Sequence, residues 1–139
     1  MTVLLDVNVI VSAVLAPLGT VRKILTCWES KRFEVIISEG IVAEVEEKLG
    51  DPKIGGHYNI KEDEIIAVRN LLITQARFVT VSQKDILLVT GDPEDDYVLA
   101  TGKLGKHEFL VTGDKRLLSM KNYADVKIVS PKSFLSLLG

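Results

Sequence analysis

The chain of 139 residues holds a single cysteine, Cys27, so it cannot form an internal disulfide. Cys27 falls within an apolar helical pattern, and we expect a packed core thiol there rather than a reactive one. No apolar run approaches the roughly 20 residues that span a bilayer, and the amino terminus has no signal-peptide pattern. We therefore expect no membrane attachment and a reducing, cytoplasmic location.

The sequence also lacks an excess of positive charge and several common catalytic motifs. Its formal net charge is −2, so nucleic-acid binding would depend on a local basic patch. Neither a GxxxxGK[ST] phosphate-binding loop nor a GxSxG serine-hydrolase turn occurs. No Cys/His cluster has zinc spacing, and His57 and His107 are each expected at the surface or in a loop.

Short apolar runs alternate with helical patterns along the chain. Five stretches are predicted strands: residues 3–5, 33–37, 77–81, 109–112 and 126–129. This alternation predicts an α/β fold, a three-layer α/β/α sandwich around a central, mostly parallel five-stranded sheet. The first helix is predicted at 10–15. The length fits a single domain over residues 1–139, and we find no internal repeat or linker.

Asp6 and Asp114 each follow the end of a predicted strand. An unpaired carboxylate inside a buried strand is costly, so Asp6 is expected at the carboxyl end of residues 3–5. Asp114 comes after Gly113, which permits a tight turn; taken alone, it is more simply explained as a helix N-cap. Because parallel strands end at the same edge of a sheet, the two acids are expected on one edge.

The stretch GDPEDDYVLATG contains three further aspartates at the start of a predicted helix. Pro93 suits the first helical position, which makes Asp92 the N-cap. Asp95 then falls at the third position, where an acid can reach back to the cap. Asp96 has no such structural role and borders the apolar face that begins at Tyr97, which makes it a candidate functional residue.

Glu44 flanks the apolar stripe of the helix predicted at 38–49, but Glu46 flanks its other side equally well. Taken alone, Glu44 is more simply explained as a surface residue. Several carboxylates gathered on one sheet edge would repel each other unless a cation were present. Hard oxygen ligands of this kind suit Mg²⁺ or Mn²⁺.

Four segments make the chain resemble the PIN-domain family of metal-dependent nucleases, and more narrowly the VapC-like toxins of prokaryotic toxin–antitoxin pairs. They are DVNVIVSA (6–13), ISEGIVAEVEEKL (37–49), DPEDDYVLA (92–100) and LVTGDKRLL (110–118). Each segment alone is weak, but the four stand in the family's order and the match covers nearly the whole chain. One departure is Thr101-Gly102, where the family usually continues with an Ala-rich helix.

The resemblance implies an Mg²⁺- or Mn²⁺-dependent endoribonuclease, a hydrolase of RNA phosphodiesters and the toxin of a type II toxin–antitoxin pair. It also implies an antitoxin protein as partner and a homodimer. The implied catalytic and metal-binding residues are Asp6, Glu44, Asp96 and Asp114, with Asn8, Ser12 and Thr112 supporting them. The basic residues Lys115 and Arg116 follow Asp114 and are candidates for binding substrate.

Two alternatives stay open at this point. A Mg²⁺-dependent phosphatase also uses an aspartate at a strand end, although that class typically has a second acid two residues later, where this chain has Asn8. A non-catalytic PIN scaffold that binds RNA or protein would share the fold without cutting.

Overall fold

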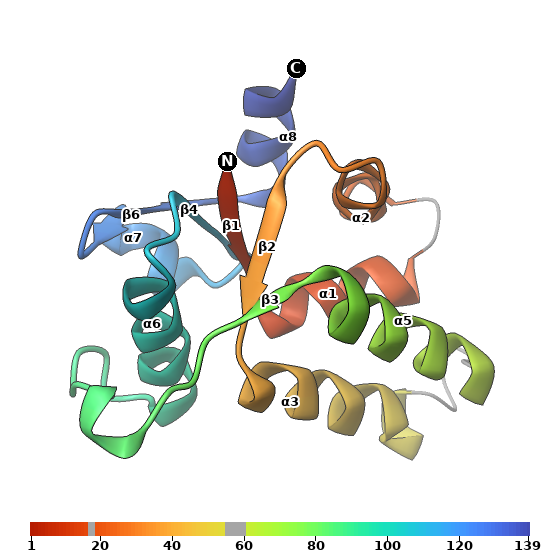
Figure 1. Ribbon diagram of the computed structural model, residues 1–139, viewed down its shortest axis with the longest axis horizontal. Helices are drawn as coiled ribbons and strands as arrows, with labels where there is room; N and C mark the ends of the chain where they lie inside the picture. Colours follow the sequence, from red (N-terminus) through yellow and green to blue (C-terminus); the bar gives the residue numbers. More distant parts are fainter. Residues whose placement is uncertain (17–18, 55–60) are drawn as a thin grey trace.

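The computed structural model describes residues 1–16, 19–54 and 61–139. Within these residues, six strands form one sheet in the order β3-β2-β1-β4-β6-β5 (Figure 1). The strands are β1 (Thr2–Leu5), β2 (Glu34–Ile37), β3 (Arg77–Phe78), β4 (Phe109–Val111), β5 (Asn122–Tyr123) and β6 (Val126–Val129). Neighbouring strands pair in parallel except β5, which runs antiparallel to β6.

Helices cover both faces of the sheet, which gives the predicted three-layer α/β/α architecture. They are α1 (Val7–Leu15), α2 (Arg22–Glu29), α3 (Glu39–Gly50), α5 (Glu62–Gln75), α6 (Pro93–Gly105), α7 (Lys115–Met120), α8 (Pro131–Leu138) and the 3-10 helix η1 (Gln83–Asp85). Figure 1 shows α1, α3 and α5 grouped on one side of the sheet, and α6 and α7 on the other. None of the described helices is long and apolar enough to cross a membrane.

The core forms where the central strands meet the inner faces of the helices. Val3, Leu4 and Leu5 of β1 are fully buried, because β1 lies in the middle of the sheet with a helical layer on either side. Burying one such side chain contributes roughly 1.5–3 kcal/mol to the stability of the fold. Strand β1 therefore holds Asp6, the residue that follows it, in a fixed position. Helix α6 runs through Thr101 and Gly102 without interruption, so the departure from the family pattern does not break it.

The sheet has one strand more than predicted. The two-residue strand β5 joins β6 through Ala124 and Asp125, whose φ angles of 47° and 71° are those of a tight hairpin turn. A strand of two residues has too few positions to show an alternating pattern, which is why the sequence predicts five strands. The first helix also begins earlier than predicted, at Val7 directly after Asp6.

His107 lies in a loop, between α6 and β4, which is one of the two places predicted for it. It is not at the surface, however, because only 3% of it is exposed. Its ring nitrogens Nδ1 and Nε2 lie 3.1 Å and 2.7 Å from the carbonyl oxygens of Gly102 and Ile36, so it links α6 to β2. His57 lies outside the described residues.

Candidate active site

Asp6 and Asp114 lie together at the carboxyl edge of the sheet. Strands β1 and β4 are neighbours in register, with Leu5 opposite Val111, so the residues that follow them are brought close. The hydroxyl of Thr112 donates to Asp6 Oδ2 at 2.7 Å and accepts the backbone N–H of Asp114 at 3.0 Å. Thr112 therefore connects the two acids directly.

The environment of Asp6 disfavours its charged form. Only 7% of Asp6 is exposed, and this burial raises the pKa of its carboxyl group. The hydrogen bond from Thr112 lowers that pKa, the negative charge of Asp114 raises it, and the positive charge of Lys48 lowers it. A buried carboxylate beside a second one is a position where a bound cation would relieve repulsion.

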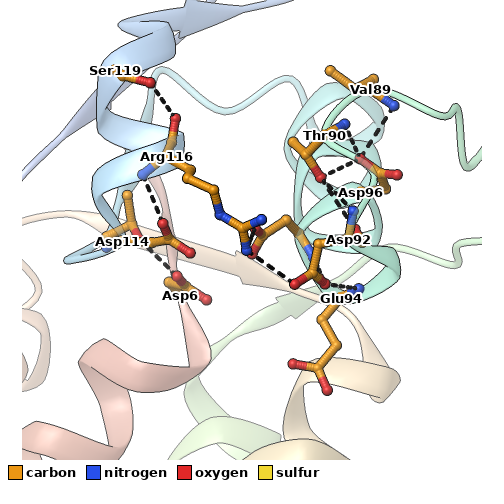
Figure 2. Close-up of polar contacts among 11 residues, drawn as sticks. Asp6, Val89, Thr90, Asp92, Glu94, Asp96, Asp114, Arg116 and Ser119 are labelled. Carbon is orange, nitrogen blue, oxygen red and sulfur yellow. Dashed lines mark hydrogen bonds and ion pairs between the residues drawn. The ribbon is translucent and has the colours of Figure 1, made fainter.

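Asp96 does not join these two acids. Its Oδ1 accepts the backbone N–H groups of Val89 and Thr90, at 3.3 Å and 2.8 Å, and the Thr90 hydroxyl at 2.9 Å. Figure 2 shows its carboxylate turned toward Val89 and Thr90 and away from Asp6. Burial opposes ionisation of Asp96, but these hydrogen bonds hold its pKa below the usual range. Asp96 thus fixes the loop that precedes α6.

Asp95, which is not predicted as a site residue, is the α6 acid that interacts with the others. Burial raises the pKa of Asp95 to about 6, and the negative charges of Asp114, Asp92 and Asp6 add to the effect. Its side chain is 13% exposed and its Oδ2 lies 3.3 Å from Nη2 of Arg116. The electrostatic coupling expected of Asp96 is therefore found at the preceding residue.

The N-cap of α6 explains why Asp95 does not have the capping role that was predicted for it. Asp92 caps α6 as predicted, accepting the backbone N–H groups of Glu94 and Asp95. Its own N–H already donates to the Thr90 hydroxyl at 3.1 Å, so Asp95 has no cap donor to reach back to. The side chain of Asp95 is left for the sheet edge and for Arg116.

Glu44 borders the same edge from α3. It forms an ion pair with Lys48 at 3.6 Å, and Lys48 in turn donates to Asn8 Oδ1 at 3.1 Å. Partial burial and the charge of Glu94 raise the pKa of Glu44. Lys48 and Glu94 are not predicted from the sequence, although the four-residue spacing of Glu44 and Lys48 is that of a helical ion pair.

Two surface cavities adjoin these acids. One, of about 550 Å³, is lined by Glu44, Glu94 and Tyr97 among others. The second, of about 320 Å³, is lined by Asn8, Ser12 and Asp114 among others. The predicted supporting residues Asn8 and Ser12 therefore face the same space as Asp114.

A short repeat underlies the arrangement, contrary to the expectation that the chain has none. The pentapeptide LVTGD occurs at residues 88–92 and again at 110–114. In both copies the Thr hydroxyl accepts the N–H of the following Asp, and that Asp caps a helix, α6 or α7.

The donor chemistry fits a hard divalent cation. The carboxylates of Asp6, Asp95 and Asp114 repel each other and offer only oxygen, as Mg²⁺ and Mn²⁺ prefer. As the side chains stand, no three Asp, Glu, His or Cys residues in the described part of the chain are close enough to hold an ion. Arg116 instead supplies positive charge, with Nη2 3.1 Å from Asp92 Oδ2 (Figure 2).

Comparison with known proteins identifies the class. The family model of the PIN domain matches residues 2–116, which include every acid of this site, and the chain belongs to the PIN-domain family. The fold is similar to a chain in the crystal structure of VapBC2 from Rickettsia felis bound to a DNA fragment from their promoter. That similarity has a TM-score of 0.61 at 14% identity, covering 94% of this chain and 98% of the other. No curated protein matches the sequence significantly.

Proposed function

We propose that this protein is a divalent-metal-dependent ribonuclease and the toxin of a type II toxin–antitoxin pair. Membership of the PIN-domain family supports a nuclease, and the fold shared with a VapBC2 chain supports the toxin assignment. The observation that carries the proposal is that Thr112 bonds to both Asp6 and Asp114 at one sheet edge, where the negative charges of these two acids help to raise the pKa of Asp95.

In this proposal three of the acids hold the cation and two act around them. Asp6, Asp95 and Asp114 would hold one or two Mg²⁺ or Mn²⁺ ions, with Glu44 contributing from the margin. A bound cation supplies positive charge that offsets the charge developing on a phosphodiester attacked by water. Thr112 holds Asp6 and Asp114 in their relative orientation. Asp96, assigned to the metal by resemblance, positions the loop before α6 instead.

The substrate in this proposal is single-stranded or loop RNA, whose backbone can enter an open groove. Lys115 and Arg116, and with them Lys48, are the basic groups beside the acids that would meet phosphate oxygens. An antitoxin protein would cover the acidic edge, and the VapBC2 complex supports a partner of that kind. We also propose that residues 1–139 act as a single domain, that the protein self-associates and that it works in the cytoplasm.

The test compares the wild-type protein with Asp6→Asn on a set of RNAs, with Mn²⁺ and with EDTA. We expect Mn²⁺-dependent cleavage by the wild type, and none by Asp6→Asn or in EDTA. Asp125→Asn is the matched control, because Asp125 is an exposed turn residue at a positive φ that asparagine tolerates. Cleavage by Asp6→Asn at the wild-type rate would refute the proposal.

A non-catalytic PIN scaffold is the second candidate, and one observation favours it. Arg116 already neutralises part of the acidic edge through Asp92 and Asp95, so the site does not require a metal for charge balance alone. The scaffold would bind Mn²⁺ weakly and leave every RNA uncut in the same assay.

A further inference from the structure

Arg116 places a positive charge among the carboxylates of the proposed site. Its guanidinium Nη2 lies 3.1 Å from Asp92 Oδ2 and 3.3 Å from Asp95 Oδ2. Its backbone N–H donates to Asp114 Oδ1 at 2.8 Å. One residue therefore contacts three acids, two of them through a side chain that begins in α7 and reaches across to the start of α6 (Figure 2).

The two ends of this contact differ in their freedom to move. The Arg116 side chain is 63% exposed, whereas that of Asp95 is 13% exposed. The guanidinium can leave for water by rotating its own side chain, while Asp95 is fixed on the first turn of α6 beside the sheet. Ion pairs with such exposed groups are weak, so this contact can open at little cost.

A guanidinium and a divalent cation meet the same electrostatic need at Asp95, and both cannot occupy the same oxygen. We propose that Arg116 is the resident counter-ion of this site: it pairs with Asp95 in the absence of a divalent cation and swings away when one binds. The inference rests on the proposed function, because it takes Asp95 as a ligand of the cation. The released fork is then free to meet two oxygens of an RNA phosphate.

This exchange has a direction that can be measured without any cleavage assay. A cation that must displace Arg116 binds more weakly than it would to the same carboxylates without that competitor. Arg116→Gln should therefore bind Mn²⁺ more tightly than the wild type, by about three- to tenfold, the range that one or two exposed ion pairs provide. A residue that merely positioned Asp95 for the metal would give the opposite result.

The experiment is a calorimetric titration of Mn²⁺ into the wild type, Arg116→Gln, Arg116→Lys, Lys115→Gln and Asp6→Asn, the last of which shows whether the ion binds through Asp6. Lys115 is the exposed neighbour of Arg116, so Lys115→Gln removes the same charge without removing the contact to Asp95. We expect Lys115→Gln to change the affinity by less than about twofold. Arg116→Lys keeps the charge but loses the fork, and should fall between the wild type and Arg116→Gln.

The outcomes separate this inference from the proposed function. If the wild type binds Mn²⁺ through Asp6 but Arg116→Gln binds no more tightly than Lys115→Gln, the counter-ion role is overturned and the nuclease proposal stands. If the wild type binds no Mn²⁺, or if Asp6→Asn binds it as tightly as the wild type, the proposed function fails, and this inference fails with it. Circular dichroism on each variant confirms that the affinities come from folded protein.

Discussion

The two copies of LVTGD have the same local structure and different surroundings. In residues 110–114 the leucine and valine lie buried in β4, in the middle of the sheet. In residues 88–92 no strand forms, Leu88 is 96% exposed and Val89 is 40% exposed. Each copy nevertheless ends in an aspartate that caps a helix and whose N–H donates to the preceding threonine hydroxyl.

The difference lies in the carboxylate that each threonine reaches. Thr112 donates to Asp6, which is 106 residues away in sequence, and so connects two strand ends. Thr90 donates to Asp96, six residues away, and so closes a loop onto its own helix. The pentapeptide thus specifies a turn and a helix cap. Only the copy that follows a strand of the sheet brings its turn next to the Asp6 carboxylate. On this comparison we propose that Asp96 is structural and that Asp95 acts with Asp6 and Asp114.

The largest expected effect on cleavage comes from replacing Asp95 and Asp96 by asparagine, one at a time. Asp95→Asn should reduce Mn²⁺-dependent cleavage by about a hundredfold or more, because it removes a carboxylate of the proposed site. Asp96→Asn should retain most of the cleavage and lower the thermal stability, since an amide is a poorer acceptor for Val89 and Thr90. Cleavage rates and melting temperatures of the two variants check this. The reverse pattern would return Asp96 to the site.

The next effect separates the two threonines. Thr112→Val removes a donor to the buried Asp6 carboxylate and strands the N–H of Asp114, which should cost about 1–3 kcal/mol and most of the activity. Thr90→Val likewise removes the acceptor of the Asp92 N–H, but it should cost less and leave cleavage intact, because Asp96 keeps the two backbone donors. Urea unfolding of both variants gives the free energies. Equal activity losses would mean that both copies serve the site.

Much of this arrangement could be predicted from the sequence, because it follows from local rules. Apolar runs set the strands, and the parallel sheet then brings Asp6 and Asp114 to one edge. Pro93 identifies Asp92 as the cap. The roles of Asp95 and Asp96 could not be predicted, because they depend on which groups fill the cap and the loop. Thr90 takes the Asp92 N–H, and the backbone at Val89 requires an acceptor.

A smaller effect is the opposite pH dependence of the two neighbours. The folded-state pKa of Asp95 is raised to about 6, so its charged form destabilises the fold and stability is lost as pH rises through that value. The pKa of Asp96 is lowered from 3.8, so its contribution is present above that pH and is lost as pH falls below it. At pH 7 we expect Asp95→Asn to raise the melting temperature by roughly 2–5 °C and Asp96→Asn to lower it.

These shifts can be read from melting curves of the two variants between pH 3 and pH 8. The gain for Asp95→Asn should shrink as pH falls below about 6, where the wild-type carboxyl is already protonated. The loss for Asp96→Asn should persist until the pH falls below 3.8. If the melting temperatures of both variants changed with pH in the same way, the two carboxyl groups would have the same environment, and the proposed difference between them would be wrong.

The most direct test is a crystal structure of the protein grown with Mn²⁺, in which anomalous scattering locates the ion. We predict an ion bound by carboxylate oxygens of Asp6, Asp95 and Asp114, with Arg116 turned away from Asp95 and with Asp96 still bonded to Val89 and Thr90. The alternative is that Asp96 binds the ion. Its Oδ2 is buried and has no hydrogen-bond partner among the described residues, so the ion would then be found at that oxygen. An ion bound at that oxygen, with Asp95 still paired to Arg116, would contradict the account.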